Sequence, residues 1–349
     1  MSTRLAPPGA ASKYRWVWQA AAALVFLEGA QITASRGLEP FASWFYVLAW
    51  WPYIFIIDTI TFGLKGESWL RTRPAEFLLM LPWSVFIWLV FELFNLRLAN
   101  WHYINVTPEL PVRWAGYFLS FATVLPGIFL TADLLGTLGL WRGSRTRPIP
   151  RARAWYPYFY TAGVLSALLP LLWPEYFFPL VWGAFVFLLE PVNHARGADS
   201  LMADLERGRP RRIVLLLAAG FVCGGLWEFW NFWAKTKWVY SVPNVPDLKL
   251  FEMPLAGFLG FPPFALECFV MYTFIRLCLG RLGRARAALG GAVLIAATCL
   301  AAFSLMDRQT VRSFAAPEGQ AVNGQTADRR TTYGQLPSPE PRLPQEPGR

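Results

Sequence analysis

Long apolar runs alternate with short polar loops along most of the chain, and this pattern predicts a polytopic, all-α membrane protein. A helix needs roughly 20 mainly apolar residues to cross about 30 Å of hydrocarbon. Prolines inside several runs are compatible with helices, because neighbouring helices in a bundle can satisfy the freed carbonyl groups. The predicted transmembrane helices, about nine in number, cover residues 16–34, 41–61, 75–96, 113–140, 156–173, 176–193, 212–233, 253–277 and 287–305.

Both ends of the chain lack an apolar face. The segment 307–349 is rich in Pro, Gln, Arg, Thr and Gly, and it cannot bury enough surface to offset the entropy of ordering it. We therefore expect a disordered N-terminus at 1–12 and a disordered polar C-terminal tail at 307–349.

Three short sequence blocks recur in the same order in the two halves of the chain. Such self-similarity predicts a tandem duplication. An even number of helices in each copy gives both copies the same orientation, as parallel repeats about an axis along the membrane normal. We expect two four-helix repeats at 13–142 and 154–282, followed by one additional transmembrane helix at 283–306. The matching blocks are 49–58 with 181–190, 66–68 with 197–200, and 91–103 with 227–240.

The net charge of +10 comes from basic residues in the loops, and their distribution predicts the orientation. Cytoplasmic loops carry an excess of Lys and Arg. Twenty Lys and Arg lie before the first predicted helix or in the loops after helices two, four, six and eight. The opposite loops hold six: Arg36, Arg97, Arg113, Lys235, Lys237 and Lys249. We expect a bacterial inner-membrane protein with its N-terminus in the cytoplasm and its C-terminus outside.

The composition narrows the partners and cofactors. Only 15% of residues are charged, against roughly 25% in soluble domains, so the predicted partner is the lipid bilayer. Without a soluble domain to carry a basic surface, no nucleic-acid partner is expected. The four cysteines lie in apolar runs without a CxxC pattern, and two histidines are too few for a haem pair. No cofactor and no metal site are predicted, although a metal held by carboxylates stays open.

Two acid–amide pairs within the predicted helices are the main candidates for chemistry. Acids inside a membrane are expensive and are functional candidates by default. In each repeat a Glu lies three residues before an Asn, so both share one helical face and the amide can hold the carboxyl group. A W-x-Y motif follows each pair. These residues are Glu92, Asn95, Trp101 and Tyr103 in the first copy, and Glu228, Asn231, Trp238 and Tyr240 in the second.

Structural explanations compete with this interpretation. A Glu near a helix end can pair with a loop cation, here Arg97, Lys235 or Lys237. A second repeated pair, Asp58 and Glu190, lies close to basic residues in the same way, and we expect interfacial ion pairs there. The W-x-Y motifs also fall where the aromatic belt of a membrane protein is expected.

An acid in a membrane span followed by W-x-Y, a turn and a Pro-containing aromatic helix resembles the small integral-membrane lycopene cyclases and the related carotenoid hydratases. Those proteins are also built from short duplicated multi-helix units. The resemblance covers about residues 91–130 and 227–267. In the family a Pro is followed closely by a pair of acids, whereas here Glu252 precedes Pro254 and the segment Leu255-Ala-Gly follows it. The acid pair of the family motif is therefore not preserved.

The resemblance implies an isomerase or lyase of carotenoid-like biosynthesis that processes a lipid or an isoprenoid by acid chemistry, without a redox cofactor. Burial would keep a carboxylic acid neutral, aromatic faces would stabilise a carbocation, and the site would exclude water. The candidate catalytic residues are Glu228, Asn231, Glu252, Glu92 and Asn95. The candidate substrate-binding residues are Trp227, Trp230, Trp238, Tyr240, Trp101 and Tyr103.

Two other function classes remain open. A small-solute or proton-coupled transporter would also use parallel repeats and paired intramembrane acids. A structural or assembly subunit without catalysis would use the aromatic loops to dock a partner or pigment. The second repeat is the better candidate for the active half, because it is richer in tryptophan and contains Glu252 and Pro254.

Overall fold

The computed structural model describes residues 14–244 and 248–315 and is mostly helical. The first half contains α2 (Arg15–Ser35), α3 (Phe41–Lys65), α4 (Trp69–Thr72), α5 (Pro74–Leu98), β1 (Trp101–Ile104), α6 (Leu110–Phe121) and α7 (Val124–Thr137). The second half contains η1 (Ala152–Trp155), α8 (Tyr156–Leu172), α9 (Pro174–Phe177), η2 (Phe178–Trp182), α10 (Ala184–Ala195), α11 (Leu201–Glu206), α12 (Arg211–Trp233), β2 (Lys237–Tyr240), β3 (Lys249–Leu250), β4 (Met253–Pro254), η3 (Leu255–Gly260), α13 (Phe261–Leu279) and α14 (Arg284–Gln309).

Within these residues, eight helical stretches are long and apolar enough to cross a membrane, which identifies an integral membrane protein. The predicted span without a counterpart among these stretches, 156–173, forms α8, whose 17 residues are fewer than the roughly 20 that a perpendicular helix needs. A count of nine therefore stays a prediction. The eight stretches are 15–35, 41–65, 74–98, 110–137, 174–195, 211–233, 255–279 and 285–309.

Several predicted spans are broken helices. The run 113–140 divides into α6 and α7, and the hydroxyl of Ser84 bridges the break by donating to the Phe121 carbonyl at 2.7 Å and accepting the Leu125 N–H at 3.0 Å. The run 176–193 divides into α9, η2 and α10, where the carboxylate of Glu267 accepts the Phe185 N–H at 2.9 Å. Neighbouring side chains thus satisfy backbone groups that a break would otherwise leave unpaired.

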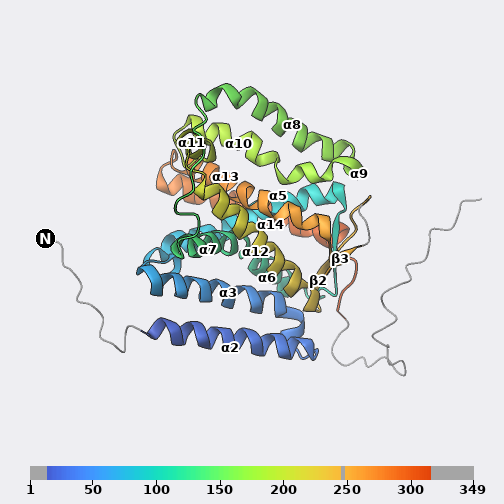
Figure 1. The fold of residues 1–349 in the computed structure, drawn as a ribbon. Coiled ribbons are helices and arrows are strands. Elements are labelled where there is room, and N and C mark those ends of the chain that lie inside the picture. The colour runs from blue at the N-terminus through green and yellow to red at the C-terminus, as the bar shows by residue number, and fades with distance from the viewer. Residues whose placement is uncertain (1–13, 245–247, 316–349) are drawn as a thin grey trace, which may run out of the picture. The chain divides into compact units, whose positions relative to one another are not determined.

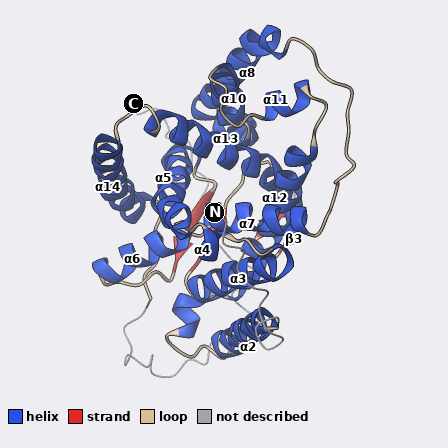
Figure 2. Cartoon of the chain, turned by 90° about the vertical axis from the view of Figure 1, so that its left-hand side faces the viewer, coloured by secondary structure: helices blue, strands red, loops and turns tan. Residues whose placement is uncertain are grey.

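The two W-x-Y segments form a short β-ribbon, so the purely α-helical prediction is wrong at this point. Strands β1 and β2 are antiparallel, and Trp101 faces Tyr240 while Tyr103 faces Trp238. The ribbon, drawn in red in Figure 2, lies among the helices. Aromatic residues are favoured in strands, but four-residue strands need their partner to form.

Residues 307–315 correct the predicted start of the C-terminal tail. Helix α14 continues to Gln309, and Asp307 accepts bonds from the Arg113 guanidinium at 2.9 Å. Beyond it, the Thr310 carbonyl accepts the Tyr103 N–H at 2.8 Å, which extends the ribbon along β1. The expected disorder at 1–12 and from 316 onward lies outside the described residues.

The helices pack around an aromatic interior. Helices α2 and α3 lie along one side of the bundle and α8 and α10 along the other, with α5, α12, α13 and α14 between them (Figure 1). The Trp50 side chain is fully buried, with ring centroids 5.4 Å from Trp227 and 5.0 Å from Trp230. This packing places the ends of α5 and α12 next to the β-ribbon.

Candidate functional site

Each β-strand of the ribbon is attached to the preceding helix by a buried asparagine. After α5, the Asn95 amide donates to the Trp101 carbonyl at 2.8 Å, and its oxygen accepts the Asn100 N–H at 2.9 Å. After α12, the Asn231 side-chain N–H donates to the Trp238 carbonyl at 2.8 Å. The Asn231 side-chain oxygen accepts the backbone N–H of Trp238 at 3.0 Å. These amides contact backbone groups and not the neighbouring carboxyl groups, so the expected Glu–Asn contact is wrong.

In the first half, Glu92 is completely buried and is held by three aromatic donors. Its Oε1 accepts the Trp88 indole N–H at 2.9 Å, the Trp101 indole N–H at 3.1 Å and the Tyr103 hydroxyl at 2.5 Å. Its Oε2 has no hydrogen-bond partner among the described residues. Three donors on one oxygen fix this carboxyl group firmly.

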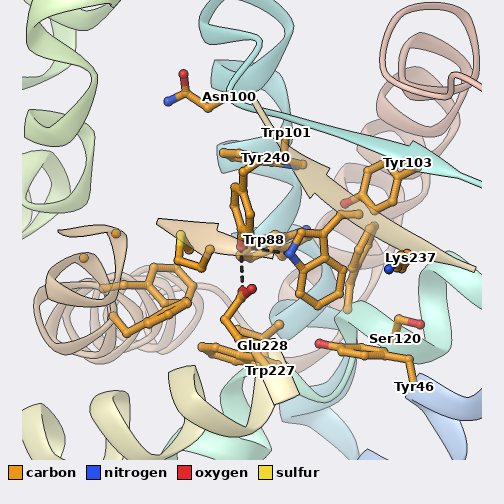
Figure 3. A pocket seen from close by; sticks show the side chains of 18 of the residues that line it. Tyr46, Trp88, Asn100, Trp101, Tyr103, Ser120, Trp227, Glu228, Lys237 and Tyr240 are labelled. Carbon is orange, nitrogen blue, oxygen red and sulfur yellow. Dashed lines mark hydrogen bonds between the residues drawn. The ribbon is translucent and has the colours of Figure 1, made fainter. Parts of the chain in front are cut away.

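In the second half, Glu228 is equally buried, and one hydrogen bond to its side chain lies within 3.5 Å among the described residues. The Tyr240 hydroxyl donates to its Oε1 at 2.8 Å, as Figure 3 shows. The same hydroxyl accepts the Trp238 indole N–H at 2.8 Å. The Oε2 atom of Glu228 also lacks a hydrogen-bond partner in the described part of the chain. Burial, followed by the proximity of Glu228, raises the pKa of Tyr240 well above its usual value, so this hydroxyl remains a donor.

The ion-pair explanation for these acids is not what the geometry shows. Lys235 pairs with Glu39 at 2.7 Å, and Lys237 pairs with Glu252 at 2.5 Å. Burial alone would raise the pKa of Glu39, but the hydrogen bonds from Lys235 and Ser43 hold it below its usual value. Both lysines of this loop are thus engaged with acids other than Glu228.

A cavity of about 670 Å³ lies beneath the β-ribbon, between the two halves (Figure 3). This volume is within the range of roughly 300–1,000 Å³ that is typical of small-molecule sites. Of the sequence candidates, the lining contains Glu228, Trp227, Trp238, Tyr240, Trp101 and Tyr103. The other candidates are outside the lining: Glu92, Asn95, Trp230, Asn231 and Glu252.

The wall also contains aromatic residues that are not sequence candidates, among them Trp182 and Phe264. Trp182 stacks on Phe91 with centroids 5.4 Å apart, and Phe264 packs edge-on to Trp182 at 5.6 Å. Phe264 also lies 5.9 Å from Trp227. A signal for Trp182 existed, since it lies in the repeated block 181–190 opposite Trp50.

The second repeated acid pair has a structural role at the other end of the bundle. Asp58 accepts the Leu70 N–H at 3.0 Å, and Glu190 accepts the Met202 N–H at 2.9 Å. The expected ion pair of Asp58 is absent from the described contacts, because Lys65 pairs with Asp133 instead. These carboxyl groups hold the short helices α4 and α11.

No cluster of three or more His, Cys, Asp or Glu side chains suited to a metal ion occurs among the described residues. Scans of protein-family models, curated proteins and solved structures each returned no match to this chain. The cavity and the carboxyl group in its wall are therefore the features of the molecule that bear on function.

Proposed function

We propose that this integral membrane protein binds an isoprenoid or a similar unsaturated lipid in the cavity beneath the β-ribbon, and that Glu228 donates a proton to it. One observation carries the proposal. A fully buried carboxyl group has one oxygen held by Tyr240 and the other without a described partner, at the wall of an aromatic cavity.

Hydrogen-bond direction identifies the donating atom. A phenol has one proton to donate, and the Tyr240 oxygen already accepts the Trp238 indole N–H. The Tyr240 hydroxyl donates to Oε1 of Glu228, which acts as an acceptor. A neutral Glu228 then carries its own proton on Oε2. A neutral acid also costs less to bury than a carboxylate, and no described cation pairs with Glu228.

The proposed reaction needs no oxidant or reductant. The Oε2 proton is transferred to one carbon of a C=C bond, which leaves a carbocation on the other carbon and a carboxylate at Glu228. The faces of Trp227 and Trp238 stabilise the cation. Return of a proton from an adjacent carbon to the carboxylate restores the acid and gives a rearranged or cyclised product. This chemistry agrees with the resemblance to lycopene cyclases and carotenoid hydratases.

A direct test is to identify what occupies the cavity. Solvent extraction of the purified protein, followed by mass spectrometry, should return an unsaturated isoprenoid lipid at about one molecule per chain, as expected for a site of this size. A Trp227→Ala variant, which removes a large part of the wall, should retain less of it. Recovery of phospholipids alone, in the proportions of the surrounding membrane, would contradict this proposal.

A proton-coupled transporter is the second candidate, and one observation favours it. Glu190 and Glu267 are also fully buried, each with one carboxylate oxygen that has no described hydrogen-bond partner. Buried acids at several levels of a bundle are typical of proton relays in pumps and transporters.

We further propose that residues 13–142 and 154–282 are tandem repeats. The equivalent asparagines make the same bonds to the β-strands, and the equivalent acids Asp58 and Glu190 each accept an N–H twelve residues further on. In the strand pairing, His102 faces Val239, and on either side of this pair the Trp of one W-x-Y motif faces the Tyr of the other. Such symmetry supports an axis that relates the two halves.

The proposed topology places the N-terminus in the cytoplasm and residue 338 outside. In a variant whose four native cysteines are replaced by alanine, single cysteines at Ser144 and Ser338 should react oppositely with a membrane-impermeant thiol reagent in intact cells. Only the cysteine at 338, which lies outside the described residues, should be labelled. Equal labelling at both positions would overturn the orientation or the number of spans.

A further inference from the structure

The cavity reaches the outer surface of the bundle between α3 and α6. The lining includes Trp44 and Val47 on α3, and Val112, Gly116 and Ser120 on α6. The spacing of three residues on α3 and four on α6 places each set on one helical face. Val112 is 40% exposed, and the others are half-buried. The wall of the cavity is therefore continuous with the surface at this gap.

Gly116 leaves the gap open. A Cβ atom added at this position would meet only the Trp44 ring, at 3.9 Å, which is an ordinary contact. On the other flank, formed by η2 and η3, a Cβ atom at Gly257 would come within 2.2 Å of the Met253 sulfur, so Met253 packs directly on this glycine. The lining residues Leu180 and Leu259 of that flank are also exposed. Glycine weakens a helix, and Gly116 does not have the positive φ that would require it.

The position and chemistry of the gap suit an apolar molecule. Both flanking helices belong to stretches apolar enough to cross a membrane, so the gap opens toward lipid. Arg113 is the charged lining residue that lies nearest in sequence to Val112 and Gly116, and its guanidinium is bound to Asp307 at 2.9 Å. A bilayer-dissolved hydrocarbon can enter here without desolvating a free charge.

We propose that the gap between α3 and α6 is a lateral portal, through which a linear isoprenoid dissolved in the bilayer enters the cavity. The proposal rests on the proposed function, since it specifies that the substrate is a membrane-partitioned chain and how it reaches Glu228. The portal has its own prediction, which concerns the rate of entry and not the chemistry.

The test uses Gly116→Leu in the full-length protein in phosphatidylcholine vesicles. The added side chain occupies the gap, and its Cβ is accommodated. The matched control is Gly225→Leu on α12, which is outside the cavity lining and where an added Cβ meets nothing within 4 Å. Fusion with vesicles that carry farnesol bearing a diazirine introduces the probe at time zero. Flash irradiation at set times, followed by mass spectrometry, measures the labelling of the peptide that contains Glu228. This labelling is expressed relative to that of the peptide around Val25 of α2, which is exposed.

We expect Gly116→Leu to slow labelling of the Glu228 peptide by about tenfold or more, while Gly225→Leu matches the unmodified protein. If Gly116→Leu fails to fold, Val112→Trp closes the same gap from its exposed side. Equal labelling rates in folded portal variants and control would overturn the portal and leave the cavity's function intact. Absence of Glu228-peptide labelling in the unmodified protein would overturn both the proposed function and the portal.

Discussion

Replacing Glu228 with glutamine should abolish turnover of an isoprenoid substrate while leaving folding intact. Glutamine keeps the shape of the side chain, and its carbonyl oxygen can still accept the Tyr240 hydroxyl. It lacks the titratable proton that the alkene must receive. Removal of a general acid typically lowers the rate by about 10²–10⁴-fold. The measurement is product formation by purified protein in vesicles, together with incorporation of deuterium from heavy water.

The matched control is Glu92→Gln in the first half. Glu92 is as deeply buried as Glu228, but it does not line the cavity and three donors hold it. We expect Glu92→Gln to keep turnover close to that of the unmodified protein. Full activity of Glu228→Gln would overturn the role of this acid. For a transporter, the same change would instead remove the pH dependence of uptake, and for a structural subunit it would change neither property.

Tyr240→Phe separates positioning of the acid from proton donation. The substitution removes the single described donor to Glu228 and leaves the ring in the wall of the cavity. We expect a partial loss of turnover with substrate binding preserved, because Oε2 still carries a proton but is less well oriented. An unchanged rate would show that the Trp238–Tyr240–Glu228 chain does not orient the acid.

The helices of this protein follow directly from local sequence, whereas their interruptions do not. A run such as 75–96 contains enough apolar residues to form a span by itself, and α5 covers it. The break before α10 depends on Glu267, which lies more than 80 residues away and accepts the Phe185 N–H. Sequence periodicity contains no information about that contact. The same reasoning applies to Asp307, which the sequence pattern places in a polar tail because its partner Arg113 lies on a distant helix.

In the candidate site, too, local sequence predicts which residues are involved, whereas distant contacts decide what each of them does. A repeated intramembrane acid with W-x-Y selects Glu228, Trp238 and Tyr240 from the sequence, and all three line the cavity. Their separate roles depend on tertiary contacts. Glu252 is paired with Lys237, and Trp230 packs against the buried Trp50. Composition does not distinguish a tryptophan in a cavity wall from one in the core.

Replacing Asn95 with alanine should destabilise the fold more than most single substitutions. The change leaves the N–H groups of Asn100 and Trp101 and the Trp101 carbonyl without their side-chain partner, in a buried position. Each buried backbone group left unpaired costs about 1–3 kcal/mol, so we expect a loss of roughly 3–5 kcal/mol in the free energy of unfolding. Thermal denaturation in detergent, followed by near-ultraviolet circular dichroism, measures the change.

The control for this substitution is Ser241→Ala, which removes one exposed bond to the Ala99 carbonyl. An exposed hydrogen bond contributes about 1 kcal/mol or less, so this variant should denature close to the unmodified protein. Since the Asn95 amide contacts only backbone groups among its described partners, turnover per folded molecule should be unchanged in Asn95→Ala. If Asn95→Ala lost turnover but kept normal stability, Asn95 would take part in the chemistry. Its effect could then not be explained by weaker attachment of β1 to α5.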